Sequence, residues 1–290
     1  RLGVAPTPQV AFEAQRRHAL GAVVSASHNP WTDNGIKLFA AGGVKLVDEV
    51  ERQIEAELSQ LDDHPRPAPS TEVPGRVTDA SADHDAYIAH VVGFLEGLRL
   101  DGMRIVLDAA NGAAHHIGPR VLRAAGAEVI VVAASPNGRN INDRCGATAP
   151  SLVAEAVVEH RAQVGIALDG DADRLIAVDH TGNIVDGDHI IAIVANDLRS
   201  RGELRHDTVV VTVMTNLGFR LAMRATGIEV VETGVGDRYV LEALATGGFS
   251  LGGEQSGHVI FADHATTGDG ILTAVALLDA VQRAGRRSRS

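Results

Sequence analysis

Short apolar runs and longer amphipathic stretches alternate along the central and C-terminal parts of the chain. Runs that fit buried strands begin at Arg104, Glu128 and Val164, and stretches with helical spacing separate them. The same order of strands and helices returns between residues 208 and 253. Because strand–helix–strand units build parallel sheets covered by helices, this pattern predicts an internal repeat. The expected fold class is α/β, with consecutive similar domains whose mixed sheets are sandwiched by helices.

The N-terminal part predicts a different arrangement. A buried strand is expected at residues 20–24, a turn-rich loop at 25–35, and a pair of strands at 36–40 and 43–47 around two glycines. Asp48 is expected to cap a helix that carries one apolar stripe. The stripe comprises Val50, Ile54, Leu58 and Leu61.

The proline-rich and polar residues 62–76 are typical of a linker. A length of 290 residues suggests two or three domains. We therefore expect a first domain at residues 1–76, a second at 77–184 that opens with a helix near Asp83, and a third at 185–290.

Composition narrows the functional classes. With 45% hydrophobic residues and no apolar run long enough to span a bilayer, the chain predicts no membrane role. The 37 acidic residues exceed the 26 basic ones, and a net charge of −11 argues against nucleic acid as the main partner. The single cysteine, Cys145, cannot form an intramolecular disulfide, so we expect a structural thiol and a cytoplasmic location. The chain starts at Arg1 without a signal-peptide pattern.

Three carboxylates follow the predicted strand that begins at Val164. Asp169, Asp171 and Asp173 occupy alternate positions, close enough to hold one hard cation through oxygen ligands. A helix-loop-helix calcium site is excluded because its pattern requires Gly and Glu where this chain has Arg174 and His180. The alternative is a solvated acidic turn that caps neighbouring backbone. Repulsion among three like charges favours the metal site.

Ser27 lies in the turn-rich loop after the first strand, where a hydroxyl could be exposed and rigidly held. As a nucleophile it would need a base and an electrophile stabiliser, for which Lys37, His28 and Arg174 are candidates. The alternative is a serine that only caps a turn. No G-x-S-x-G elbow surrounds any serine, which disfavours a Ser-His-Asp hydrolase.

Two further loops follow strands of the second repeat. Glu254, Ser256 and His258 lie in a short glycine-flanked loop whose groups suit sugar hydroxyls, although a tight strand connection would look similar. Gly236 and Arg238 lie where a strand gives way to a helix, so they could meet an anion at the helix N-terminus. A lone turn of this kind is usually structural.

Taken together and in this order, five motifs resemble the α-D-phosphohexomutases: SASHNP, NGIK, DGDADR, TGVGDRYV and GEQSGH. The match spans nearly the whole chain. Within that family, GEQSGH, INDRCGAT (141–148) and ATTGDGILTA (265–274) are similar to the phosphoglucosamine mutase subgroup, and Gln255 carries much of the distinction. The stretch GATAP at 146–150 departs from the commoner GSTH-type stretch.

The resemblance implies that Ser27 is phosphorylated and that one Mg²⁺ per chain is bound by its phosphate together with Asp169, Asp171 and Asp173. It also implies that Arg174 touches the phosphoserine region and that Lys37 and His258 are acid/base candidates. Glu254 and Ser256 would contact the sugar. The remaining substrate contacts are expected from His28, Gly236 and Arg238.

The implied reaction interconverts glucosamine 6-phosphate and glucosamine 1-phosphate, with glucosamine 1,6-bisphosphate as primer and intermediate, for amino-sugar nucleotide and cell-wall precursor synthesis. The implied partner is therefore a small sugar phosphate, with an activating kinase possible. Family members also carry an opening arginine-containing loop and a fourth, phosphate-binding domain, which we expect to be absent here. The alternatives are a phosphomannomutase/phosphoglucomutase, a metal-dependent phosphatase and an inactive binding fragment.

Overall fold

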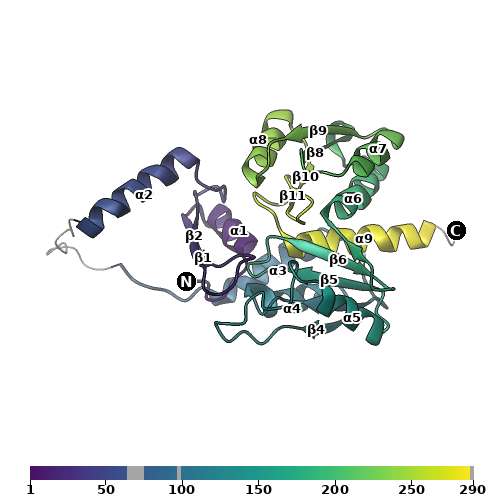
Figure 1. Ribbon diagram of the computed structural model, residues 1–290, viewed down its shortest axis with the longest axis horizontal. Coiled ribbons are helices and arrows are strands. Elements are labelled where there is room, and N and C mark those ends of the chain that lie inside the picture. The colour runs from purple at the N-terminus through teal and green to yellow at the C-terminus, as the bar shows by residue number, and fades with distance from the viewer. Residues whose placement is uncertain (64–74, 97–98, 288–290) are drawn as a thin grey trace.

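The computed structural model describes residues 1–63, 75–96 and 99–287, and it contains three sheets flanked by helices (Figure 1). Most of the proline-rich linker predicted at 62–76 therefore lies outside the described residues. The expected α/β class with mixed sheets is confirmed.

The first sheet has two antiparallel strands, β1 (Gly21–Ser25) and β2 (Gly35–Phe39). Helix α1 (Thr7–Arg17), which the sequence pattern did not reveal, packs on β1 through a small apolar cluster. The predicted strand at 43–47 is wrong, because only one bridge, between Phe39 and Lys45, extends the ladder. The chain turns at Gly43, whose φ is 74°, and enters a helix before a third strand can pair.

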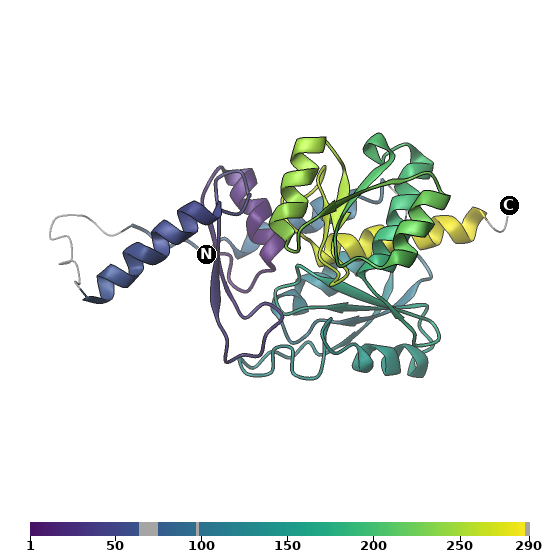
Figure 2. The ribbon, with the colours of Figure 1, turned by 45° about the horizontal axis from the view of Figure 1, so that its top comes forward.

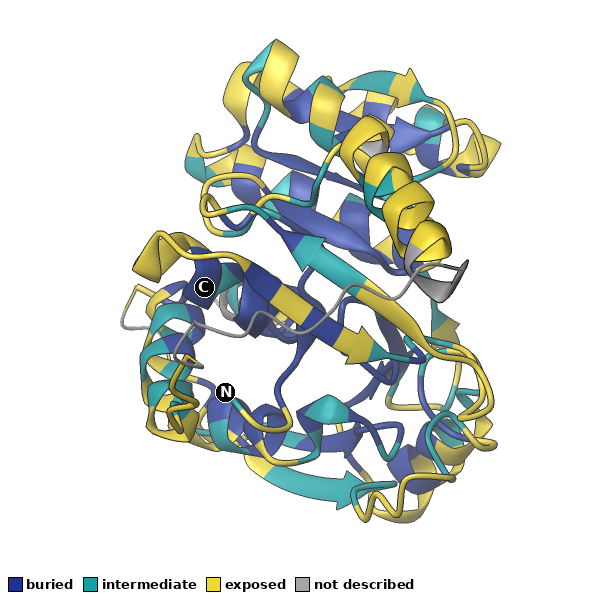
Figure 3. Cartoon of the chain, turned by 90° about the vertical axis from the view of Figure 1, so that its left-hand side faces the viewer, coloured by how far each residue is buried: buried dark blue, intermediate teal, exposed yellow. Residues whose placement is uncertain are grey.

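That helix, α2 (Asp48–Asp63), projects away from the rest of the molecule. Its apolar stripe lies outside the core: Val50 and Leu58 are exposed and Ile54 is half-buried, as the yellow colouring in Figure 3 shows for most of the helix. The side chain of Leu61 lies outside the described residues.

The second sheet has the strand order β4-β3-β5-β6-β7. Strands β3, β4 and β5 are parallel, β6 pairs antiparallel with β5, and β7 pairs antiparallel with β6. The strands are β3 (Arg104–Asp108), β4 (Glu128–Val132), β5 (Val164–Leu168), β6 (Leu175–Asp179) and β7 (Ile184–Val185). The helices of this part are α3 (His84–Gly93), α4 (Ile117–Ala124), α5 (Ser151–Glu159) and 3-10 turns at Ser81–Asp83 and Ala113–His115.

The third sheet has the order β11-β10-β8-β9, with only β11 antiparallel. Its strands are β8 (Thr208–Thr212), β9 (Glu229–Thr233), β10 (Leu251–Gly253) and β11 (Val259–Phe261). The helices are α6 (Gly187–Arg201), α7 (Leu217–Ala225), α8 (Asp237–Gly247), α9 (Gly270–Arg287) and a 3-10 turn at Arg205–Asp207. No helix of the described part is long and apolar enough to cross a membrane.

The predicted repeat is confirmed by topology. In each of the two larger sheets the first strand lies beside both the second and the third, and a fourth strand returns antiparallel to the third. The polar loops at 169–174 and 254–258 both follow the third strand of their sheet. Equivalent strand ends therefore present the two candidate ligand loops.

Helix α9 joins the two larger sheets into one core. It runs between them (Figure 2) and contacts α3, α4 and β5 on one side and α6 and β11 on the other. Asp269 caps its N-terminus, because its Oδ1 accepts from the backbone N–H groups of Ile271 and Leu272. The other oxygen, Oδ2, accepts a 2.8 Å hydrogen bond from the fully buried Tyr87 hydroxyl on α3. Burial raises the pKa of Asp269 to about 6.

We predict that Tyr87→Phe lowers the free energy of unfolding by about 1–3 kcal/mol, because it leaves a buried carboxylate oxygen without its donor. The urea midpoint of the variant measures the effect. Tyr239→Phe, at a position that is 45% exposed, is the matched control and should leave the midpoint unchanged. Equal midpoints for the two variants would show that the Tyr87–Asp269 bond does not stabilise the fold.

Candidate active site

The three predicted metal ligands lie together in the tight turn after β5. Asp169, Asp171 and Asp173 are at most 3% exposed, and one carboxylate oxygen from each lies within 4.8 Å of the others. The turn is closed by the Arg174 backbone N–H, which donates to Asp169 Oδ1 at 3.1 Å. Alternation along the turn thus makes three carboxylates converge.

Each of these carboxylates has one buried oxygen without a hydrogen-bond partner: Asp169 Oδ2, Asp171 Oδ1 and Asp173 Oδ1. Buried polar atoms are rarely left unsatisfied, and hard divalent cations such as Mg²⁺ prefer oxygen ligands. The donor set therefore fits a magnesium ion. Burial and the charges of Asp173 and Asp171 hold the pKa of Asp169 well above its usual range.

Two side chains from the first segment donate hydrogen bonds to this cluster, and one of them, Lys37, also neutralises part of its charge. Lys37 on β2 donates from Nζ to Asp171 Oδ2 at 2.6 Å and to Asp173 Oδ2 at 2.8 Å. Burial by itself would lower the pKa of Lys37, but the carboxylates of Asp173 and Asp171 outweigh it and raise the pKa above its usual value. The hydroxyl of Thr7, at the start of α1, donates to the same Asp171 oxygen at 2.6 Å. Sequence reasoning missed Thr7 because α1 itself was not expected.

Ser27 lies in the loop that connects β1 to β2, which we call the Ser27 loop (residues 26–34). Its backbone has a φ of 54°, and its Oγ lies 3.4 Å from His28 Nδ1. The Ser27 carbonyl packs closely on Gly170 of the carboxylate turn. A Cβ added to Gly170 would lie 2.4 Å from the Ser27 carbonyl oxygen. The structure thus brings the candidate serine against the candidate metal site.

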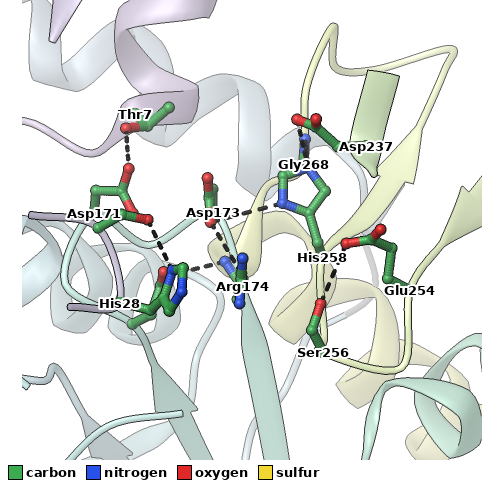
Figure 4. A network of polar contacts seen from close by, with 12 residues as sticks. Thr7, His28, Asp171, Asp173, Arg174, Asp237, Glu254, Ser256, His258 and Gly268 are labelled. Carbon is green, nitrogen blue, oxygen red and sulfur yellow. Dashed lines mark hydrogen bonds and ion pairs between the residues drawn. The ribbon is translucent and has the colours of Figure 1, made fainter. Parts of the chain in front are cut away.

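His28 and Arg174 lie on the same side of this turn, as Figure 4 shows. Burial and the nearby Arg174 charge lower the pKa of His28. The Arg174 guanidinium is partly exposed and lies 3.8 Å from Asp173 Oδ1. Both side chains therefore border the carboxylates, and Arg174 approaches Asp173 Oδ1 without forming a hydrogen bond to it.

His258, from the loop before β11, reaches the cluster from the third sheet (Figure 4). Its Nδ1 lies 3.6 Å from Asp173 Oδ1, and its Nε2 accepts from the Gly268 backbone N–H at 3.1 Å. Burial raises the pKa of Asp173, but His258 and Lys37 outweigh this effect and hold it well below its usual range. His258 is only 3% exposed, so its imidazole is almost entirely shielded from solvent.

Sequence reasoning also missed an ion pair beside His258. Lys45, from the segment wrongly expected to be a strand, pairs with Asp237 at the start of α8. Asp237 Oδ2 is 3.7 Å from His258 Nε2. The pair links the first segment to the third sheet, and no local sequence signal connects residues so far apart along the chain.

The predicted sugar-binding groups lie in two adjoining loops of the third sheet. Glu254 Oε1 accepts from the Gly236 N–H at 3.0 Å, and Ser256 Oγ lies 3.4 Å from Glu254 Oε2. Arg238 is exposed, with its guanidinium over the Tyr239 ring. The structure therefore brings Glu254, Ser256 and Gly236 together.

The 254–258 loop is tied to the carboxylate turn through the backbone. Leu175, the residue after Arg174, donates its N–H to the Gly257 carbonyl at 3.0 Å. Gly257 has a φ of 89°, and a Cβ there would lie 2.0 Å from the Leu175 carbonyl oxygen. Only glycine permits this approach, which places the candidate sugar loop beside the candidate metal site.

We predict that Mg²⁺ stabilises this protein by about 2.7 kcal/mol when its concentration is a hundredfold above the dissociation constant, because the ion binds only the folded carboxylate cluster. Thermal unfolding with and without MgCl₂ measures the shift in Tm. Asp169→Asn, which keeps the acceptor for Arg174, should abolish the shift, whereas Asp101→Asn at an exposed position should retain it. An undiminished shift in Asp169→Asn would place the ion elsewhere.

Comparison with known proteins shows which family this chain resembles along its length. Residues 1–64, 85–182 and 186–290 match the models of α/β/α domains I, II and III of the phosphoglucomutase/phosphomannomutase family. The chain is 55% identical to the phosphoglucosamine mutases of Nocardioides sp. and Streptomyces coelicolor, over 100% of this chain and 64% of each relative. It therefore spans somewhat less than two thirds of these relatives.

A solved structure shows the same fold. The phosphoglucomutase/phosphomannomutase family protein of Burkholderia thailandensis superimposes with a TM-score of 0.79 at 27% identity, covering 96% of this chain and 61% of that one. Three consecutive domain models, the relatives and this structure agree along the chain. The chain belongs to the phosphoglucomutase/phosphomannomutase family, the α-D-phosphohexomutases.

Proposed function

We propose that this protein acts as a phosphoglucosamine mutase, interconverting glucosamine 6-phosphate and glucosamine 1-phosphate. The observation that carries the proposal is the Ser27 loop packed on three buried carboxylates, each with a free oxygen. The identity to phosphoglucosamine mutases along the whole chain favours the amino sugar over other hexoses.

In this proposal Asp169, Asp171 and Asp173 hold Mg²⁺ together with an oxygen of phosphorylated Ser27. The ion would supply neutralisation of the phosphoryl charge during transfer. Arg174 and His28, which border the cluster, would bind phosphoryl oxygens. Lys37 would then have two functions: it holds Asp171 and Asp173 in place, and it would offer its ammonium group to the phosphoryl group.

The phosphoryl group would move from Ser27 Oγ to the free hydroxyl of the sugar phosphate, giving glucosamine 1,6-bisphosphate. The hydroxyl proton is released as the new P–O bond forms, and the serine oxygen is left as a hydroxyl. After the bisphosphate turns over, its other phosphoryl group returns to Ser27. Lys37 and His258 are the candidate proton carriers, and the Lys37 side chain, at 26% exposed against 4% for His258, is the more accessible.

Glu254, Ser256 and Gly236 would bind sugar hydroxyls, since they form one polar surface beside the carboxylate turn. Arg238, in the exposed first turn of α8, would meet the distal phosphate. We further propose that the units at 1–76, 77–184 and 185–290 form three domains around the site, of which the second and third share the core built on α9. A cytoplasmic location and an activating kinase for Ser27 complete the proposal.

Conversion of glucosamine 6-phosphate to glucosamine 1-phosphate tests the function, with Mg²⁺ and glucosamine 1,6-bisphosphate present. The assay compares this chain with a longer protein. The longer protein adds the parts of a phosphoglucosamine mutase relative that lie outside the matched 64%. Glucose and mannose phosphates run in parallel. Preference for either would replace the amino-sugar assignment by a phosphoglucomutase/phosphomannomutase, and release of free phosphate alone would indicate a phosphatase. Mg²⁺ binding without turnover by either protein would indicate a binding fragment.

We predict that Ser27→Ala lowers mutase turnover at least about a thousandfold, because the variant lacks the phosphoryl carrier but loses only one small hydroxyl. Circular dichroism and Tm should match the parent. Ser59→Ala on α2, whose hydroxyl bonds only the Glu55 carbonyl, is the control and should keep full activity. Turnover of Ser27→Ala near that of the control would refute the assignment of Ser27.

A further inference from the structure

The loop between β4 and α5 (residues 133–150) reaches across to the Ser27 loop and forms hydrogen bonds with it through the Asn142 side chain. Asn142 Nδ2 donates to the carbonyl oxygen of Ser27 at 2.7 Å and to that of Asn29 at 2.8 Å. Both protons of this amide group are therefore directed at the backbone on either side of His28. Asn142 lies in the segment 141–148, to which the proposed reaction gives no role.

The backbone that Asn142 holds is in an unfavourable conformation. Ser27 has a φ of 54°, a region that residues other than glycine adopt with strain and that persists only when the surroundings enforce it. Within the loop, the Asn29 N–H donates to the Ala26 carbonyl at 3.0 Å and the Ser27 N–H to Ser25 Oγ at 2.9 Å. These bonds close the turn onto itself and onto the end of β1, but neither ties it to another sheet or loop.

Two contacts tie the turn down from different sides. Gly170 of the carboxylate turn lies against the Ser27 carbonyl, and Asn142 donates to the same oxygen. Ile141 also packs on Gly170, where an added Cβ would come within 2.6 Å of Ile141 Cδ1. The Ser27 carbonyl is thus enclosed between the carboxylate turn and the 133–150 loop.

The chemistry of asparagine suits this position. Asn142 has a φ of 56°, a left-handed conformation that asparagine tolerates better than most residues, and its own N–H is fixed by the Ala110 carbonyl at 2.9 Å. An aspartate would have the same shape but would present only acceptors to two carbonyl oxygens. Farther along the same interface the Arg139 guanidinium lies 5.4 Å from the centre of the Trp31 ring.

We propose that Asn142 is a positioning residue for Ser27: by binding the carbonyls of Ser27 and Asn29, it fixes the strained loop so that Ser27 Oγ stays beside the carboxylate cluster. The positioning of the loop follows from the geometry alone. Its consequence for phosphoryl transfer rests on the proposed function.

The first test measures hydrogen exchange at the Asn29 backbone amide by NMR. This measurement requires no enzymatic activity. Asn142→Asp keeps the shape of the side chain, and Asn142→Gly keeps the freedom to adopt a positive φ; both remove the two donated bonds. Each should speed exchange of the Asn29 amide by about tenfold or more, because the turn opens more often without its anchor.

Asn140→Ala is the matched control. Asn140 lies in the same loop and also donates from Nδ2 to a carbonyl, that of Ser135 at 3.0 Å, but both its side-chain bonds stay within the loop. It should leave exchange at Asn29 unchanged. Equal exchange rates in the Asn142 variants and the control would overturn the proposal, and Tm values of all variants identify any that fail to fold.

The second test is single-turnover phosphorylation of Ser27 by glucosamine 1,6-bisphosphate, followed by mass spectrometry in the longer protein. In Asn142→Asp the rate at saturating bisphosphate should fall about a hundredfold, as expected for a misplaced reacting group, while the half-saturating concentration stays within about twofold. A rise in half-saturating concentration with an unchanged maximal rate would assign Asn142 to sugar binding instead. If the parent is not phosphorylated, the proposed function fails, and the exchange experiment still decides the role of Asn142.

Discussion

The arrangement of the site depends on the electrostatic cost of three carboxylates buried within 4.8 Å of one another. Burial strengthens their mutual repulsion, so the fold must supply compensating groups. Lys37 comes from the first sheet, Thr7 from α1 and His258 from the third sheet. Because Lys37 and Thr7 belong to the first segment and His258 to the third, satisfying the acidic turn of the second segment brings all three to the same point.

The repeated topology makes this convergence possible. Each of the two larger sheets presents a polar loop after its third strand, and α9 packs against both sheets from between them. The loops are joined directly where Leu175 donates to the Gly257 carbonyl. The apolar core around α9 therefore sets the distance between the acidic turn and the loop of Glu254 and Ser256.

The first segment is held differently from the other two. Its sheet has only two strands and its own apolar cluster is small, and α2 extends away from it with an exposed stripe. Phe12 on α1 packs against the large core beside Tyr87, and the contacts around the site are polar: Lys37 and Thr7 to the acidic turn, Lys45 to Asp237, and the Ser27 loop to Asn142. The strained backbone at Ser27 is therefore supported by groups outside its own segment, so the loop does not depend on a large local core.

The sequence by itself determined the alternation of strands and helices in residues 84–287, the repeat, and the position of the Asp169–Asp173 turn, because these depend on local periodicity and on turn residues. It also placed Ser27 in a loop after a strand. Only the tertiary structure decided that 43–47 is not a strand and that Thr7, Lys45, Asp237 and Asn142 adjoin the site. These features depend on pairing between residues far apart in the chain, such as Lys37 and Asp171, 134 positions apart, and that pairing is fixed by how the sheets pack. Periodicity within a segment carries no information about such packing.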